Sequence, residues 1–351
     1  MPGMRRYPPS SDRSLTVLSA ADRLLIDWAA GEATPDAPTL VLHDRFGAVA
    51  LSLSGAVQFV ASFHSQETAL QLNTDHRAVP VTRLLEEPLQ AVRRAVMRIP
   101  KSLALFEFYL AYVAASAKPD TRLAAGFMTR HFTPRLLEIA GKYAGQVRQS
   151  RAVKKARLLL LQDFRAGAGA REKMDCVEFN SRHYRQYPGV FSANHVDHAT
   201  RFLLENWPDV PPPENILDVA CGNGIIGDQL LLRYPGARLT ATDDFILAVA
   251  SAVQNLPADS ARVIYDHTLD QVADGSQDLI VTNPPFHLGY ENNIDVSLSL
   301  FAQAKSKLRP GGQLVVVANR HLNYATHLSK WYAATEVIAD TDKFVIYRSS
   351  I

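Results

Sequence analysis

The sequence predicts an α/β protein of two domains, each built on a mostly parallel sheet with helices on its faces. Three observations support this prediction. The chain has 351 residues, which is more than one hydrophobic core usually supports. In the second half, short apolar runs alternate with helix-like segments in the manner of βα units. The first half repeats the same order of elements, which indicates an internal duplication.

The second half carries the clearer pattern. Its apolar runs predict strands at 215–219, 238–242, 262–265, 278–282 and 313–318. Helices are expected at 225–233, 245–256 and 295–308. The last two apolar runs, 336–339 and 343–347, flank a polar turn and predict a hairpin. We therefore expect a parallel sheet that ends in an antiparallel strand.

The first half follows the same order with altered motifs. The matched segments are 39–48 with 215–224, 98–101 with 282–285, 122–126 with 313–318, and 155–160 with 343–348. The first copy lacks the glycine-rich loop and the Asn-Pro-Pro motif of the second. We expect a degenerate copy of the domain in the first half.

Composition suggests where the domains begin and end. Residues 1–14 are predicted to be a disordered lead-in, and residues 15–165 the first domain. The Gly/Ala-rich stretch that follows predicts a linker at 166–175. The second domain is then expected at 176–351.

Charge is divided unevenly between the halves. Residues 1–170 carry 22 Lys and Arg against 14 Asp and Glu, and residues 171–351 carry 15 against 21. Basic surface supplies most sequence-independent affinity for nucleic acid, so we expect the first half to hold a polyanion. Two cysteines without clustered histidines argue against disulfides and a metal site and favour a cytoplasmic protein. No apolar run is long enough to predict a membrane span.

The first chemical motif is a glycine-rich turn after the strand at 215–219. Asp218 lies on the strand, and Gly222 and Gly224 allow the backbone to approach a ligand before the helix begins. Such a turn suits either a dinucleotide or S-adenosylmethionine. The acid on the strand itself favours S-adenosylmethionine, with Asp218 facing the ammonium group of the ligand.

Acidic residues also follow the next two strands. Asp243 ends the second strand, about 20 residues after the loop, where a carboxylate can accept hydrogen bonds from both ribose hydroxyls. Asp244 is expected either to share this role or to cap the next helix. Asp266 and His267 follow the third strand.

The motif Asn283-Pro284-Pro285-Phe286 indicates the reaction. Its prolines hold the chain extended and remove two backbone donors. The amide oxygen of Asn283 and the carbonyl of Pro284 can then accept both hydrogens of one NH2 group. Two acceptors favour a pyramidal nitrogen with its lone pair aimed at a methyl donor. Phe286 offers a face for stacking a base. We therefore expect methylation of an exocyclic amine.

With these motifs in view, the chain resembles the two-domain ribosomal RNA guanine-N2 methyltransferases, from about residue 22 to its end. The second-half motifs are Val190-Phe-Ser192, the loop up to Gly224, Asn283-Pro-Pro-Phe-His287 and Val317-Ala-Asn-Arg-His-Leu322. The first-half motifs are Asp44-Arg-Phe-Gly-Ala48, Pro100-Lys-Ser-Leu-Ala104 and Lys154-Lys-Ala-Arg157.

The resemblance implies two class I, Rossmann-like methyltransferase domains in tandem, the first degenerate and RNA-binding, the second catalytic. It implies that Phe191 and Ser192 lie on a segment that closes over the methionine part of the cofactor. It also implies that either Asp266 or His267 contacts the adenine. Ala220 departs from the glycine often found in the family. The implied reaction is N2-methylguanosine formation in 23S ribosomal RNA by a monomer acting on protein-free RNA.

Two basic patches are candidates for RNA binding. One consists of Arg93, Arg94, Arg98 and Lys101, and the other of Arg148, Arg151, Lys154, Lys155 and Arg157. Alternative functions are guanine-N2 methylation of 16S ribosomal RNA, methylation of adenine N6, cytosine N4 or a protein glutamine, and an RNA-binding module without activity. The last alternative predicts damage to the motifs, and they are intact.

Overall fold

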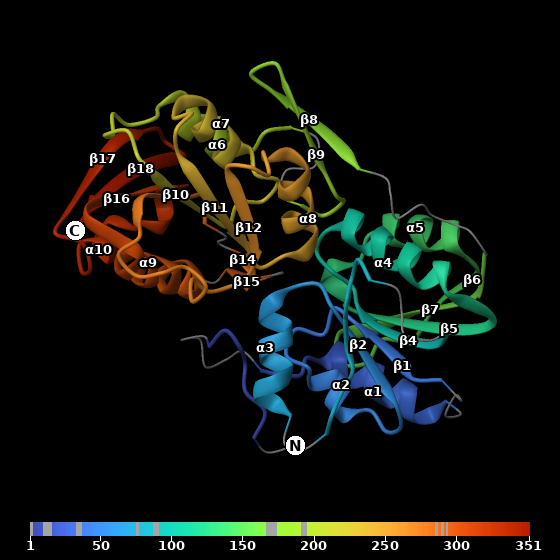
Figure 1. Cartoon of the computed structure of the whole chain (residues 1–351). Helices are drawn as coiled ribbons and strands as arrows, with labels where there is room; N and C mark the ends of the chain where they lie inside the picture. Colours follow the sequence, from blue (N-terminus) through green and yellow to red (C-terminus); the bar gives the residue numbers. More distant parts are fainter. Residues whose placement is uncertain are drawn as a thin grey trace. The chain divides into compact units, whose positions relative to one another are not determined.

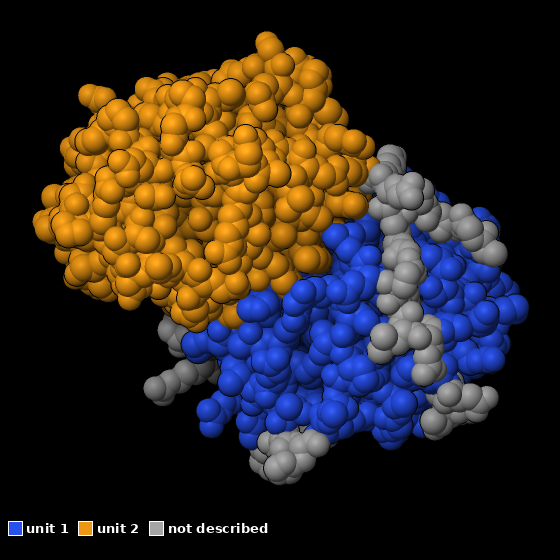
Figure 2. All heavy atoms as spheres, viewed as in Figure 1, with its two compact units in different colours: residues 1–173 blue, residues 174–351 orange. Residues whose placement is uncertain are grey.

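The computed structural model describes residues 3–9, 16–32, 37–74, 77–86, 91–165, 174–190, 195–284, 287–288, 291–292 and 294–351. The chain divides into two compact units, residues 1–173 and 174–351 (Figure 2). Within the described residues, no helix is both long enough and apolar enough to cross a membrane.

The second unit is built on a seven-stranded sheet in the order β12-β11-β10-β13-β16-β18-β17 (Figure 1). Its strands are β10 (Asn215–Val219), β11 (Arg238–Asp243), β12 (Ala261–Tyr265), β13 (Gln277–Thr282), β16 (Leu308–Asn319), β17 (Ala334–Asp340) and β18 (Phe344–Ser350). Strand β18 is antiparallel to both β16 and β17. The predicted hairpin and the parallel strands before it are confirmed.

Helices cover both faces of this sheet because its central strands are apolar on both sides. One face packs against α6 (His198–Glu205), α7 (Ile225–Arg233) and α8 (Ile246–Asn255). The other packs against α9 (Asp295–Lys307) and α10 (Ala325–Leu328). Helix α9 buries Ser297, Leu300, Phe301 and Ala304, a spacing that sets one helical stripe against the sheet.

The first unit has the same architecture. Its sheet order is β3-β2-β1-β4-β5-β7-β6, which is the order of the second sheet when strands are numbered within each unit. The strands are β1 (Thr39–Leu42), β2 (Val57–Ala61), β3 (Val81–Arg83), β4 (Val92–Arg98), β5 (Ala117–Met128), β6 (Ala144–Gln149) and β7 (Ala156–Phe164). The predicted pair of tandem Rossmann-like domains is thereby confirmed.

The helices of the first unit correspond in order to those of the second. They are α1 (Ala20–Gly31), α2 (Ala48–Ser52), α3 (His64–Asn73), α4 (Leu103–Ala115) and α5 (Arg135–Tyr143). Apolar residues of α1, α2 and α3 pack on one face of the sheet. Helices α4 and α5 lie beside each other (Figure 1).

The structure corrects several expected boundaries. Residues 3–9 are not disordered, because the backbone of Arg5 exchanges two hydrogen bonds with the side chain of Asn73 on α3, at 2.7 and 2.8 Å. Residues 166–173 of the predicted linker lie outside the described residues, and Asp175 belongs to a strand. That strand, β8 (Asp175–Phe179), forms a hairpin with β9 (Arg182–Gln186) that the sequence pattern did not predict.

Candidate active site

The glycine-rich loop joins β10 to α7 at the carboxyl edge of the second sheet. Gly222 and Gly224 have φ angles of 58° and 83°, which glycine adopts without a steric penalty. A Cβ placed on Gly222 would meet no heavy atom within 4 Å, so there is free space beside the loop. Ala220 also has a positive φ, 59°, which explains why glycine suits this position in relatives. The loop therefore has the shape expected of a ligand-binding turn.

Asp218 is fully buried below this loop. Its Oδ2 accepts a hydrogen bond from the backbone N–H of Gly227, at 3.0 Å, in the first turn of α7. Its Oδ1 is buried without a hydrogen-bond partner among the described residues. Burial raises the pKa of Asp218 to about 7. A buried carboxylate oxygen without a partner is suited to a cationic ligand group such as an ammonium.

Asp243 ends β11 and faces the same loop. Its two carboxylate oxygens accept hydrogen bonds from the backbone N–H groups of Gly222 and Phe245, both at 2.9 Å. Burial raises the pKa of this carboxyl to about 7. Each oxygen keeps a second lone pair that a ribose hydroxyl can use. Asp243 therefore also holds the backbone at the start of α8. The role of Asp244, in ribose binding or as a cap, stays a prediction.

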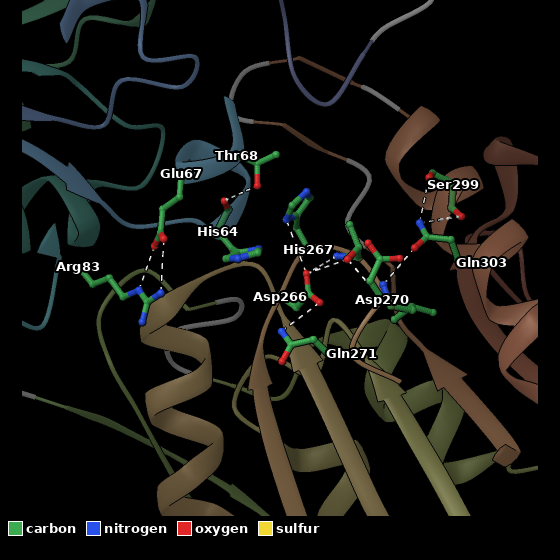
Figure 3. A network of polar contacts seen from close by, with 12 residues as sticks. His64, Glu67, Thr68, Arg83, Asp266, His267, Asp270, Gln271, Ser299 and Gln303 are labelled. Atoms are coloured by element: carbon green, nitrogen blue, oxygen red, sulfur yellow. Dashed lines mark hydrogen bonds and ion pairs between the residues drawn. The ribbon is translucent and has the colours of Figure 1, made fainter. Parts of the chain in front are cut away.

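Asp266 follows β12 and is buried within its own turn (Figure 3). Its Oδ1 accepts from the backbone N–H and the hydroxyl of Thr268, both at 2.9 Å, and its Oδ2 from Gln271 at 3.3 Å. The imidazole Nδ1 of His267 lies 3.8 Å from Asp266 Oδ1. Asp266 therefore shapes the turn after β12. The choice between Asp266 and His267 as the adenine contact stays a prediction.

Asn283 follows β13 and is held by the start of α6. Its Nδ2 donates to Asp197 Oδ2 at 2.9 Å and to Thr200 Oγ1 at 3.0 Å. The same Asp197 oxygen accepts from the backbone N–H of Thr200 and so caps α6. Because the NH2 group must face a carboxylate, the amide oxygen of Asn283 faces the other way. This is the orientation that an acceptor for a substrate amine requires.

Asp197 and Thr200 hold the side chain of Asn283, a role that the sequence did not assign to them. Helix α6 begins at His198, and Asp197 is its N-cap. Phe191 and Ser192 lie outside the described residues, as do Pro285 and Phe286 of the motif. Pro284 is buried beside Asn283.

The hairpin β8–β9 supports the cofactor loop from outside. Asn223, in the loop, donates to the fully buried Gln186 at 2.8 Å, and its carbonyl accepts from Asn255 at 2.8 Å. Asn255 also exchanges two hydrogen bonds with the backbone of Arg185. Tyr184 donates to the buried Asp228 of α7 at 2.6 Å. No short motif marks these residues, so pattern alone could not find them.

Comparison with known proteins decides the family. Residues 3–165 match the RLMG N-terminal domain, and residues 182–348 the Methyltransferase small domain. The chain is 33% identical to the ribosomal RNA large subunit methyltransferase G of Aeromonas hydrophila, over 98% of this chain and 95% of that one. It is 32% identical to the protein of the same name from Streptomyces coelicolor, over 99% of this chain and 97% of that one.

The chain belongs to the ribosomal RNA large subunit methyltransferase G family. The family predicted from the motifs is confirmed, as is its large-subunit branch. The chain is a methyltransferase, and S-adenosylmethionine is its cofactor. The unpartnered oxygen of Asp218 and the free space beside Gly222 fit this ligand.

A solved structure supports the fold of this family member over its whole length. The T. thermophilus 16S rRNA N2 G1207 methyltransferase, RsmC, in complex with AdoMet and guanosine, matches with a TM-score of 0.81. The match covers 100% of this chain and 96% of that one at 22% identity. At this identity the likeness bears on the fold and confirms the two-domain architecture.

One member of the first predicted basic patch does not lie at the surface of this methyltransferase. Arg94 is buried and donates to Thr39 Oγ1 at 2.8 Å and to the carbonyl of Ala29 at 3.1 Å, so it belongs to the core. Arg98 is ion-paired with Asp22 at 3.1 Å. Arg93 lies five residues before Arg98 on β4, about 16 Å away at the rise of a strand. Lys101 is exposed just beyond this strand.

The second predicted patch occupies the turn between β6 and β7. Arg151, Lys154 and Lys155 are all exposed there. Lys154 and Lys155 have φ angles of 47° and 61°, so the chain turns tightly at these two residues. This turn is the exposed basic cluster on which an RNA-binding hypothesis for the first unit can rest.

Proposed function

We propose that the chain transfers the methyl group of S-adenosylmethionine to the N2 amine of a guanine in 23S ribosomal RNA. The observation that carries this proposal is the orientation of Asn283. Asp197 and Thr200 hold its NH2 group, so its oxygen is presented outward beside the carbonyl of Pro284. Two such acceptors are suited to the two hydrogens of an exocyclic amine.

The cofactor supplies a methyl group made electrophilic by a sulfonium. The chain positions the amine for in-line attack, and such positioning can contribute about 7–11 kcal/mol of barrier reduction. Asn283 and Pro284 draw the two amine hydrogens to one side, which localises the lone pair of the nitrogen on the other. The nitrogen forms a bond to the methyl carbon, the carbon–sulfur bond breaks with its electrons kept by sulfur, and one amine proton leaves to water.

The residues around the glycine-rich loop are assigned to the cofactor. Asp218 faces its ammonium group, Asp243 its ribose hydroxyls, and Gly222 and Gly224 allow close approach of the backbone. Asp266 or His267 lies beside the adenine. The buried, partly hydrogen-bonded carboxylates described above support these assignments.

The first unit is assigned to RNA binding through Arg151, Lys154 and Lys155. The relatives' names support 23S RNA as the substrate. A guanine inside a duplex cannot present its amine to a methyl donor, so the target must be unpaired or flipped, at a cost of a few kcal/mol. Protein-free RNA meets this requirement best. We further assign the protein to the cytoplasm and expect it to act as a monomer.

Transfer to isolated RNA tests the proposal. Purified protein is incubated with methyl-labelled S-adenosylmethionine and protein-free 23S or 16S ribosomal RNA, and the RNA is digested to nucleosides. We expect label in N2-methylguanosine from 23S RNA alone. Label in N6-methyladenosine, or transfer confined to 16S RNA, contradicts the substrate assignment.

A further inference from the structure

A cavity of about 120 Å³ lies at the carboxyl edge of the second sheet. Its walls include Asn283 and Pro284 after β13, Asn319 at the end of β16, and Lys343 and Phe344 at the start of β18. In the sheet order, β16 and β18 follow β13 on the side opposite β10. The glycine-rich loop follows β10, so Asn283 stands between the cofactor loop and this cavity.

The cavity presents polar groups that complement the edge of a guanine. Along that edge lie the N2 amine, the N1–H donor and the O6 acceptor. If the amine meets Asn283 and Pro284, the neighbouring N1–H requires an acceptor and O6 requires a donor. Asn319 supplies an amide oxygen, and Lys343 an ammonium group with three donors.

Lys343 is well placed to act as that donor. Its backbone is fixed by hydrogen bonds from Arg320 N to its carbonyl at 2.8 Å and from its own N–H to Thr341 at 3.3 Å. Its Nζ lies 5.2 Å from the ring centroid of Phe344. Arg320 is ion-paired with Asp340. Among the described residues that line the cavity, Lys343 is the one permanent cation.

We propose that this cavity is the subsite for the target guanine and that Lys343 selects guanine by donating a hydrogen bond to O6. The inference rests on the proposed function and adds the group that distinguishes guanine from other amine-bearing purines. A lysine–guanine O6 contact is a frequent device of base recognition. In a purine that carries an amine in place of O6, that amine would face the ammonium group of Lys343, and two hydrogen-bond donors would oppose each other.

The test compares two RNAs that both carry the reactive amine. The probe is 23S ribosomal RNA assembled by ligation, with either guanosine or 2,6-diaminopurine riboside at the mapped methylation position. We expect the wild-type protein to prefer guanosine roughly 10- to 100-fold in kcat/KM, the range for one good base contact. Diaminopurine also lacks the N1 hydrogen that Asn319 would accept. Lys343→Met should therefore lose only the part of the preference due to O6, through slower transfer to guanosine, with transfer to diaminopurine unchanged.

Two variants control for general effects of charge. Lys343→Arg keeps a cationic donor and should retain a preference for guanosine. Lys330→Met removes an exposed lysine outside the cavity and should leave both rates unchanged. Cofactor affinity and thermal unfolding should be nearly the same in all variants, because Lys343 is exposed and lies far along the sequence from the glycine-rich loop.

Three results overturn the inference. Equal loss on both RNAs in Lys343→Met would mean that the lysine binds the RNA backbone. An unchanged preference would mean that Lys343 does not touch the base, and wild-type protein without preference would mean that O6 is not recognised. If wild-type protein transfers no methyl to guanosine N2 at all, the proposed function fails as well, so the two failures are distinguishable.

Discussion

The two units share one topology but differ at the carboxyl edge of the sheet. Val41 of β1 pairs with Val96 of β4, and Asp218 of β10 pairs with Val281 of β13. Because β4 and β13 are the equivalent fourth strands of the two sheets, Val41 occupies the position of Asp218. The same registers place Ala61 at the position of Asp243. The pairing of the second and third strands gives a further match. One residue beyond the last pair, Leu84 lies at the position of Asp266. Each of these three acids is replaced by an apolar residue in the first unit.

The loop after the first strand differs as well. Gly47 and Gly224 occupy equivalent positions, because each precedes its helix with a positive φ. Counting back from them matches His43 with Ala220 and Arg45 with Gly222. His43 has a φ of 53° against 59° for Ala220, so the backbone matches at this position, whereas Arg45 does not share the positive φ of Gly222. A large side chain thus replaces a small one where a cofactor would need space.

The first unit stabilises its loop by different contacts. Burial lowers the pKa of His43 to about 4, and its neutral ring donates from Nδ1 to the carbonyl of Arg98 at 3.1 Å. Asp44 accepts from the N–H of Ala50 at 2.9 Å, the counterpart of the Gly227 N–H that Asp218 accepts. The acid that holds the helix start has moved from the strand into the loop. The fold therefore persists without the site, because the site depends on a few side chains at one edge.

The largest effect is expected at Asn283. Strand pairing matches Asn283 with Arg98 of the first unit, which corrects the sequence-based match of 98–101 with 282–285 by one residue. Asn283→Ala should lower kcat roughly 10²–10³-fold, the range for loss of one preorganised polar contact in a transition state. S-adenosylmethionine affinity should stay within twofold, because the glycine-rich loop is untouched. Single-turnover transfer and calorimetry measure the two quantities.

Two controls sharpen this comparison. Asn206→Ala removes an exposed asparagine of the same unit and should leave kcat unchanged. The double variant Asn283→Ala with Arg98→Asn should stay inactive, since the first unit lacks the acids around its loop. Recovered activity in that variant would contradict the division of roles between the units.

Asp243→Ala gives the second unit the residue that the first unit has at this position, Ala61. Loss of a charged hydrogen-bond acceptor should weaken S-adenosylmethionine binding by about 1.5–3 kcal/mol, or roughly 10- to 100-fold. Asp259→Ala, which removes an exposed acid, is the matched control. Calorimetric affinities within twofold of each other for both variants would refute the assignment of Asp243 to the ribose.

Close packing at the loop predicts a stability difference between two glycines. A Cβ on Gly227 would lie 2.6 Å from Leu239 Cδ2 and 3.2 Å from Asp218 Oδ2, so Gly227→Ala should cost about 1–3 kcal/mol. Gly141 of α5 has open space around it, and Gly141→Ala should stabilise by about 0.5–1 kcal/mol. Denaturant unfolding of each variant measures both changes, and equal effects would contradict the close packing at Gly227.

The smallest effect concerns pH. The pKa of Asp218 is raised to about 7 by burial, and only its ionised form attracts a cationic ligand. Affinity for S-adenosylmethionine should therefore rise as pH increases through 7, by up to about eightfold between pH 6 and 7.5 for one proton released. Asp218→Asn should bind more weakly and show less dependence on pH. A flat wild-type profile would contradict the contact.

The same pKa shift has a consequence for the free protein. A carboxyl with a folded-state pKa above its unfolded value stabilises the fold below pH 4, and this contribution is lost as pH rises through 7. Bound cofactor should offset that loss. Thermal unfolding with and without cofactor at pH 6 and 7.5 measures the difference.

Local patterns predicted the sheet of the second unit and most positions around the cofactor loop. Alternating apolar runs and glycines are short-range signals, so the order of residues was enough to place Asp218, Gly222 and Asn283. The Asp197–Asn283 pair joins residues 86 apart, and the Asn223–Gln186 pair joins residues 37 apart. Such contacts depend on tertiary packing. The burial of Arg94 was missed because charge alone does not show which face of a strand is covered.

The central claim is that the outward-facing oxygen of Asn283, beside the carbonyl of Pro284, receives the N2 amine of a guanine. Nucleoside mass mapping of ribosomal RNA tests it, in cells that lack the protein and in the same cells supplied with wild-type protein or Asn283→Ala. We predict that one N2-methylguanosine of 23S RNA disappears and that wild-type protein alone restores it. An unchanged nucleoside profile without the protein, or full restoration by Asn283→Ala, would contradict the account.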